Sequence, residues 1–141
     1  MSIEIEVDTR EIGQLAKSFI RYNLRARLAI RSTMNNYADR LRDEVIRNAS
    51  SRPGPRIVSG RYVGSIRAKR QRDSESLYSI YVSSDAPQAR RLEYGFIGID
   101  SRGRNYAQPP YPHFRPALDR LTPELTAALA NEVFKAWGHG D

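Results

Sequence analysis

The sequence has no cysteine and only two histidines among its 141 residues. Without cysteine, disulfide bonds and thiolate metal sites are excluded. His113 and His139 lack any carboxylate at a metal-site spacing such as HExxH, and the chain has neither a phosphate-binding glycine loop before a lysine nor a GxSxG nucleophile motif. No stretch approaches the roughly 18 apolar residues of a membrane-spanning helix. We therefore expect no cofactor, no metal and no membrane partner.

The composition favours one globular domain over residues 1–141, since 40% of the residues are hydrophobic and 28% are charged. The net charge of +7 is unevenly distributed. Residues 1–72 carry 16 Lys/Arg against 7 Asp/Glu, whereas residues 73–141 carry 7 against 9. Arginine supplies 20 of the 23 basic residues. Its flat guanidinium pairs with phosphate or carboxylate, although an arginine-rich codon usage explains the bias equally well.

The spacing of apolar residues predicts an α+β fold with a long N-terminal amphipathic helix. Residues 3–7 alternate as a short strand, and Asp8 with Glu11 forms a capping-box pair ahead of a helix over residues 9–49. A helix of about 40 residues is roughly 60 Å long, beyond the roughly 37 Å diameter of a compact domain of this size. We expect it to bend near Asn35–Asn36 or to project, and the end of its apolar stripe to contact another subunit. The predicted contact residues are Tyr37, Leu41 and Val45.

The opposite face of this helix is predicted to be basic and could meet nucleic acid. No zinc-finger spacing, aromatic RNA-binding motif or short helix-turn-helix pair accompanies it. Any nucleic-acid binding is therefore expected to be weak, non-specific and steeply dependent on salt. The residues of this face are Lys17, Arg21, Arg25, Arg27 and Arg31.

The remaining chain predicts a small antiparallel sheet, a short helix and a C-terminal helix packed on the sheet. The breaker cluster at 50–55 ends the long helix, and the alternating stretch 66–71 pairs with a strand at 77–83. Pro87 is expected to open a short helix that stops at Gly95 in the left-handed αL conformation. Residues 96–108 form a looser hairpin or an extended loop. Pro116 is expected to open the last helix, with a kink or restart at Thr122–Pro123.

Three residues are candidate catalytic groups. Glu93 and Asp119 are candidates for a carboxylate pair, and His113 is a candidate acid or base. Catalysis needs more convergent groups than these, so structural roles are favoured and we expect a protein that is not an enzyme. A small hydrolase using Glu93 or His113 is the least favoured alternative.

Three stretches in this order resemble motifs of one known family. VSGRYVGSI resembles a TG-x-L-x-x-SI segment, APQARRLEYGF resembles YA-x-x-VE-x-GT, and PPYPHFRPALD resembles P-x-PFLRPAL. Together they are similar to the tailed-phage head–tail joining family, the small neck, tail-completion and tail-terminator proteins of long-tailed phages and prophages. The sequence departs from the motifs at Ser59, Tyr62, Gln88 and Phe96. The matching residues are Ser59 as a conservative replacement, Gly60, Ser65, Ile66, Ala89, Glu93, Tyr94, Gly95, Pro112, Phe114, Arg115, Pro116, Ala117 and Leu118.

The resemblance implies a structural protein of the virion, assembled in the host cytoplasm. Its partners would be further copies of itself in a closed ring, sixfold if it follows the symmetry of the tails, together with the tail tube and the head-closure or connector proteins. Non-specific contact with genomic DNA is also expected. The resemblance further implies that the proline-rich stretch before the last helix is a rigid structural element. The alternative is a basic, non-specific nucleic-acid-binding protein.

Overall fold

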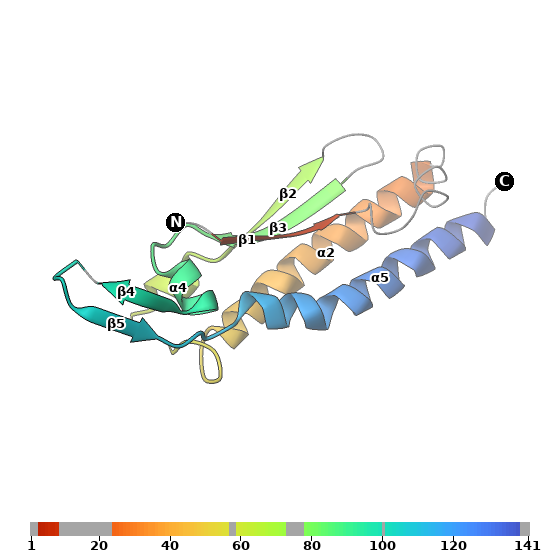
Figure 1. The fold of residues 1–141 in the computed structure, drawn as a ribbon. Helices are drawn as coiled ribbons and strands as arrows, with labels where there is room; N and C mark the ends of the chain where they lie inside the picture. The colour runs from red at the N-terminus through yellow and green to blue at the C-terminus, as the bar shows by residue number, and fades with distance from the viewer. Residues whose placement is uncertain (1–2, 9–23, 57–58, 73–77, 100, 139–141) are drawn as a thin grey trace.

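The computed structural model describes residues 3–8, 24–56, 59–72, 78–99 and 101–138. It confirms the predicted α+β class: two long helices lie beside a three-stranded sheet, and a two-stranded hairpin projects from one end (Figure 1). No helix in the described ranges is both long and apolar enough to cross a membrane. The elements in chain order are β1 (Ile3–Asp8), α2 (Leu24–Asn48), α3 (Arg61–Gly64), β2 (Arg67–Arg72), β3 (Tyr78–Ser84), α4 (Ala89–Tyr94), β4 (Phe96–Ile99), β5 (Asn105–Gln108) and α5 (Phe114–Gly138).

The core lies along the antiparallel pair formed by α2 and α5, which run side by side (Figure 1). On each helix the buried residues recur at intervals of three or four, which places them on one face. A leucine, isoleucine or phenylalanine buried in this way contributes about 1.5–3 kcal/mol. The buried apolar residues of the pair are Ile30, Met34, Ala38, Leu41 and Val45 from α2, with Phe114, Ala117, Leu121, Leu125 and Leu129 from α5.

This pairing corrects the predicted subunit contact. Each helix has 25 residues, so α5 matches the described length of α2 and covers its apolar stripe. Leu41 is 2% exposed and Val45 is 0% exposed, and both belong to the core of the chain itself. Tyr37 is half-buried at the edge of that core, beneath the guanidinium of Arg40 at 4.5 Å from its ring centroid. The stripe therefore gives no reason to expect a partner between residues 24 and 48. The predicted first half of the helix, residues 9–23, lies outside the described residues.

Charged residues tie α2 to its neighbours along the edge of the core. Arg40 bonds Glu124 of α5 at 2.7 Å, and Arg120 of α5 bonds Glu44 at 2.6 Å. The Arg40–Glu124 pair is exposed and adds about 0–1 kcal/mol, whereas Glu44 of the second pair is buried. Their main effect is to fix the register of the two helices, which the regular apolar stripes alone would leave less specific.

The three-stranded sheet is antiparallel with the order β1-β3-β2, and it packs against α2. Val82 of the central strand faces Ile5 on one side and Ala68 on the other. Val82 and Ile80 are fully buried, as expected for a central strand with one face on the helices. The strands predicted at 3–7 and 77–83 and the pairing of 77–83 with 66–71 are confirmed. The short helix α3 was not predicted.

The predicted hairpin at 96–108 is also confirmed, as β4 and β5 with Ile97 opposite Ala107. One face packs on the body of the protein, where Arg91 of α4 lies 4.2 Å from the centroid of the Phe96 ring. The other face is open: Ile97 is 88% exposed and Ile99 is 67% exposed. Two apolar side chains are thus presented to solvent at the end of the molecule.

The last helix differs from the prediction at two prolines. It begins at Phe114, two residues before Pro116. Pro116 therefore lies in the first turn, where a backbone N–H would have no partner within the helix, so the missing N–H of proline costs no hydrogen bond. The helix also continues without interruption through Pro123, so the predicted restart at Thr122 is wrong. The long helix α2 likewise runs unbroken through Asn35–Asn36. In both cases the continuous buried stripe outweighs the weak local propensity.

Candidate functional site

The three sequence motifs meet at the N-terminus of α5, around the buried carboxylate of Glu93. Oε1 of Glu93 accepts hydrogen bonds from the backbone N–H of His113 at 2.9 Å and of Phe114 at 2.8 Å, and Oε2 accepts one from Arg115 at 3.2 Å. These are N–H groups at the start of a helix, which have no partner within the helix itself. A carboxylate also complements the positive end of the helix dipole. Glu93, on α4, therefore caps α5 across 20 residues of sequence.

His113 extends this junction to the first motif. Its Nδ1 donates to the carbonyl oxygen of Tyr111 at 2.8 Å, which leaves Nε2 to accept from the hydroxyl of Tyr62 at 2.5 Å. The imidazole is 0% exposed. Close by, the hydroxyl of Ser65 contacts that of Ser84 at 2.7 Å and donates to the carbonyl of Tyr62. Residues from α3, α4 and the start of α5 thus form one hydrogen-bonded unit, which we call the motif junction.

Burial sets the protonation of two groups in the motif junction. It lowers the pKa of His113, and the opposing effects of the Tyr111 carbonyl and of Glu93, 3.2 Å from Nδ1, are smaller. Burial also raises the pKa of the Tyr62 hydroxyl, with a further contribution from the charge of Glu93. Both side chains are consequently neutral near pH 7. A neutral imidazole has one donor and one acceptor, which matches its two partners here.

The lowered pKa of His113 predicts a loss of stability on mild acidification. The unfolded chain takes up a proton as the pH falls through about 6.5, whereas the folded chain resists it, so folding is favoured above that pH and weakens below it. Urea unfolding followed by circular dichroism between pH 7.5 and 5 should show this decline. His113→Gln should be less stable at pH 7 yet show a flatter dependence on pH. An unchanged slope in His113→Gln would contradict the assignment.

The structure places the other motif residues as follows. Ile66, Ala89 and Ala117 are buried, and Leu118 packs against the core. Gly60 precedes α3 with a φ of 79°. Ser59, Tyr94, Pro112, Arg115 and Pro116 are exposed.

Gly95 corrects one prediction. Its φ is +79°, but its ψ of 172° lies outside the αL region, so the glycine turns the chain from α4 directly into the extended strand β4. Its amide donates to the carbonyl of Arg91 at 2.8 Å, which closes the last turn of α4.

The proposed catalytic groups have structural partners. Both oxygens of Glu93 are occupied by backbone N–H groups, and His113 is fully buried. Asp119 does not meet Glu93, because it forms an exposed ion pair with Arg115 at 3.1 Å. Glu93 and Asp119 are therefore not placed where both carboxylates could contact the same substrate.

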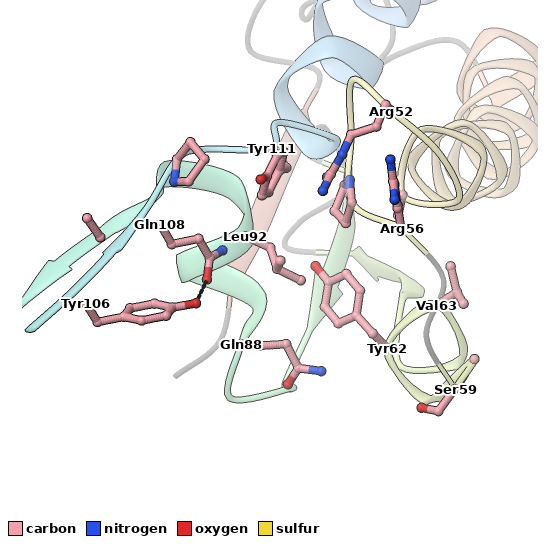
Figure 2. A pocket seen from close by; sticks show the side chains of 15 residues that line it. Arg52, Arg56, Ser59, Tyr62, Val63, Gln88, Leu92, Tyr106, Gln108 and Tyr111 are labelled. Carbon is pink, nitrogen blue, oxygen red and sulfur yellow. Dashed lines mark hydrogen bonds between the residues drawn. The ribbon is translucent and has the colours of Figure 1, made fainter. Parts of the chain in front are cut away.

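A pocket of about 540 Å³ opens on the solvent side of the motif junction (Figure 2). The loop after α2 contributes two arginines, which lie across the pocket from Tyr106 and Gln108 of β5. The sequence alone gives no sign of this site, since its residues come from four separate segments. The lining residues are Ala49, Arg52, Pro55, Arg56, Ser59, Gly60, Tyr62, Val63, Gln88, Leu92, Tyr106, Ala107, Gln108, Pro109 and Tyr111.

The predicted basic face of α2 is only partly exposed. Arg25 is exposed, but Arg27 and Arg31 are half-buried, and the Nε atoms of both lie out of contact with solvent. At 100° per residue Arg27 falls within the buried stripe and Arg31 beside it, so their assignment to the outer face was wrong. Lys17 and Arg21 lie outside the described residues.

Within the described ranges, no group of three or more His, Cys, Asp or Glu side chains could hold a metal ion. Comparisons with protein-family models, with curated proteins and with solved structures gave no match.

Proposed function

We propose that this chain is a structural subunit of the virion, forming a ring at the junction between the head and the tail of a long-tailed phage. In that role it acts as a neck, tail-completion or tail-terminator protein and joins the tail tube to the head connector. It assembles with further copies of itself in the host cytoplasm. The proposal starts from the resemblance of its three motifs to the head–tail joining family.

The observation that carries the proposal is the convergence of these motifs. Glu93 of the second motif accepts hydrogen bonds from the backbone N–H groups of Phe114 and Arg115 of the third, although the motifs are about 20 residues apart. Tyr62 and His113 lie in the first and third stretches at positions that do not match the motifs, and their hydrogen bond joins those stretches. A set of residues that builds one rigid unit is what a shared fold requires, and this supports common ancestry over chance similarity.

The projecting hairpin supports the proposed assembly. A closed ring needs two different surfaces on each subunit, one that meets the preceding copy and one that meets the next. Ile97 and Ile99 offer one such surface at the end of the molecule, away from the α2–α5 pair (Figure 1). With the stripe of α2 covered by α5, this hairpin replaces the long helix as the preferred subunit contact.

Replacing Ile97 and Ile99 together by aspartate tests the function. Both side chains are exposed, so the variant should fold with an unchanged circular dichroism spectrum. In a phage or prophage that carries this gene, it should yield separate heads and tails in electron micrographs and lower the infectious titre at least about 100-fold. The matched control, Ile97→Val with Ile99→Val, keeps the apolar face and should leave the titre near the wild-type value. Joined, infectious particles from the aspartate variant would remove the hairpin from the assembly.

The alternative, a basic protein that binds nucleic acid without sequence preference, predicts a different outcome. Purified chain would then bind duplex DNA with a steep salt dependence. Deletion of the gene would leave joined, normal particles. Unjoined heads and tails after deletion favour the structural role.

A further inference from the structure

We propose that the pocket between the loop after α2, α3, α4 and β5 binds an acidic side chain of a partner protein, presented on an extended segment beside β5. The inference does not rest on head–tail joining, because the pocket is defined by its own residues. Its volume of about 540 Å³ lies within the range of specific ligand sites, roughly 300–1,000 Å³. A pocket of this size accommodates one or two side chains with their backbone.

The positive charge of the pocket favours a negatively charged ligand. Arg52 and Arg56 both line it, and among the described lining residues none is aspartate or glutamate. Arg56 is exposed, with no hydrogen bond or ion pair to any residue in the described part of the chain. Neither charge is neutralised by a carboxylate in the lining of the pocket. The flat fork of each group is suited to bind a carboxylate through two parallel hydrogen bonds.

One of the two arginines is held in position. Nη1 of Arg52 donates to the carbonyl oxygen of Gly54 at 2.9 Å, and its guanidinium lies 3.8 Å from the centroid of the Tyr111 ring. A side chain fixed on both sides loses little conformational entropy when a ligand arrives. Arg52 is therefore a preformed element of the site, and Arg56 supplies the second charge.

The tyrosines of the pocket argue against a stacked nucleotide. One face of the Tyr111 ring is covered by Arg52, and Tyr62 meets the ring of His113 edge-on at 5.5 Å between centroids. Tyr106 is tilted against Phe96 at 5.9 Å, and its hydroxyl donates to Gln108 at 2.8 Å. Base recognition on single strands relies on aromatic faces that are free to stack. Each ring already has one contact within the chain, although Tyr106 keeps 41% of its surface exposed, whereas a slender carboxylate side chain needs only the guanidinium groups.

The strand beside the pocket favours a protein segment as the carrier. β5 belongs to a two-stranded sheet, so its outer edge has backbone groups that are not used in the β4–β5 ladder. Tyr106, Ala107, Gln108 and Pro109 line the pocket, and the same stretch borders apolar grooves over Ile97. An extended chain added along a strand edge uses main-chain hydrogen bonds for affinity and a side-chain pocket for specificity. Alternating apolar and acidic residues fit this surface.

A nuclear magnetic resonance titration of the full chain tests the proposal. The probe is a blocked peptide of alternating valine and glutamate, six residues long, and the control peptide carries glutamine at each glutamate. The acidic peptide should shift the side-chain Nε–H signals of Arg52 and Arg56 and the backbone amides of Tyr106 and Gln108. Its affinity should exceed that of the glutamine peptide at least about tenfold. No saturable shift of these signals, or equal affinity for both peptides, overturns the proposal.

Two variants and one competing ligand test whether the acidic peptide binds in the pocket itself. Arg56→Gln removes an exposed side chain and should weaken the acidic peptide about tenfold, while Arg67→Gln, an exposed arginine on β2, changes the net charge equally and should leave the affinity within twofold. Equal losses in both variants would show attraction to the overall charge and overturn the site. Thymidine 5′-monophosphate should bind more weakly than the peptide; tighter binding at the same signals would overturn the acidic segment in favour of a nucleotide.

Discussion

Glu93→Ala should lower the free energy of unfolding by about 3–5 kcal/mol. The substitution leaves the backbone N–H groups of His113 and Phe114 buried without an acceptor, and each such group costs about 1–3 kcal/mol. It also removes the negative charge at the start of α5 and leaves a space where the carboxylate was. Urea unfolding at pH 7.5 measures the loss, and circular dichroism in the absence of urea shows whether α5 still forms.

Two further variants separate the cap from the bulk of the side chain. Glu93→Gln keeps the size and one oxygen, but its NH₂ group cannot accept from the N–H of Arg115, so we expect roughly half the loss. Asp119→Asn removes an exposed carboxylate from the same helix turn and should change stability by less than about 0.5 kcal/mol. If Glu93→Ala cost no more than Asp119→Asn, the carboxylate would not be the cap that its three hydrogen bonds indicate.

Gly95→Val should cost about 3 kcal/mol or more. A β-branched residue is strained at a φ of +79°, and in the extended range of ψ this conformation is occupied almost only by glycine. A Cβ atom at this position would lie 2.9 Å from the carbonyl oxygen of Gln108 and 3.0 Å from the nitrogen of Pro110. Both are backbone atoms that cannot move without shifting the hairpin. Thermal melting followed by circular dichroism measures the effect.

Gly103 provides the matched control for this substitution. Its φ is +77°, nearly that of Gly95, but nothing lies within 4 Å of an added Cβ. Gly103→Val should therefore carry the backbone strain alone, about 1–2 kcal/mol. Similar losses in the two variants would mean that neither the extended ψ of Gly95 nor the close packing of Gln108 and Pro110 against it adds much to the cost.

The sequence allowed most elements to be predicted because their signals are local. The alternation at 77–83 identified β3, and the breaker cluster at 50–55 placed the end of α2 within two residues. What the local pattern could not show was which surface covers the stripe of α2. Leu41 and Val45 have the same periodicity whether they meet a second subunit or α5. Only the packing of two segments about 80 residues apart decides between them.

The candidate site was likewise only partly predictable from the sequence. Glu93 was singled out by its motif, but its role depends on N–H groups at His113 and Phe114, which no spacing rule connects to it. The basic pocket was missed altogether. Arg52 lies in a turn cluster and Arg56 beside it, and both resemble ordinary surface charges until β5 closes the other side of the pocket. Such a site arises from the tertiary structure and leaves no compact signature in the chain.

The distribution of the core between two helices also determines when the protein can fold during synthesis. The stripe of α2 is complete once residue 45 has been made, but its cover, from Phe114 to Leu129, is translated last among the core segments. The edge strand β1 must likewise wait for β3. A nascent chain halted before residue 114 therefore lacks the cover of Met34 and Leu41, and apolar surface exposed in this way is prone to aggregation. Native structure is reached only after α5 leaves the ribosome.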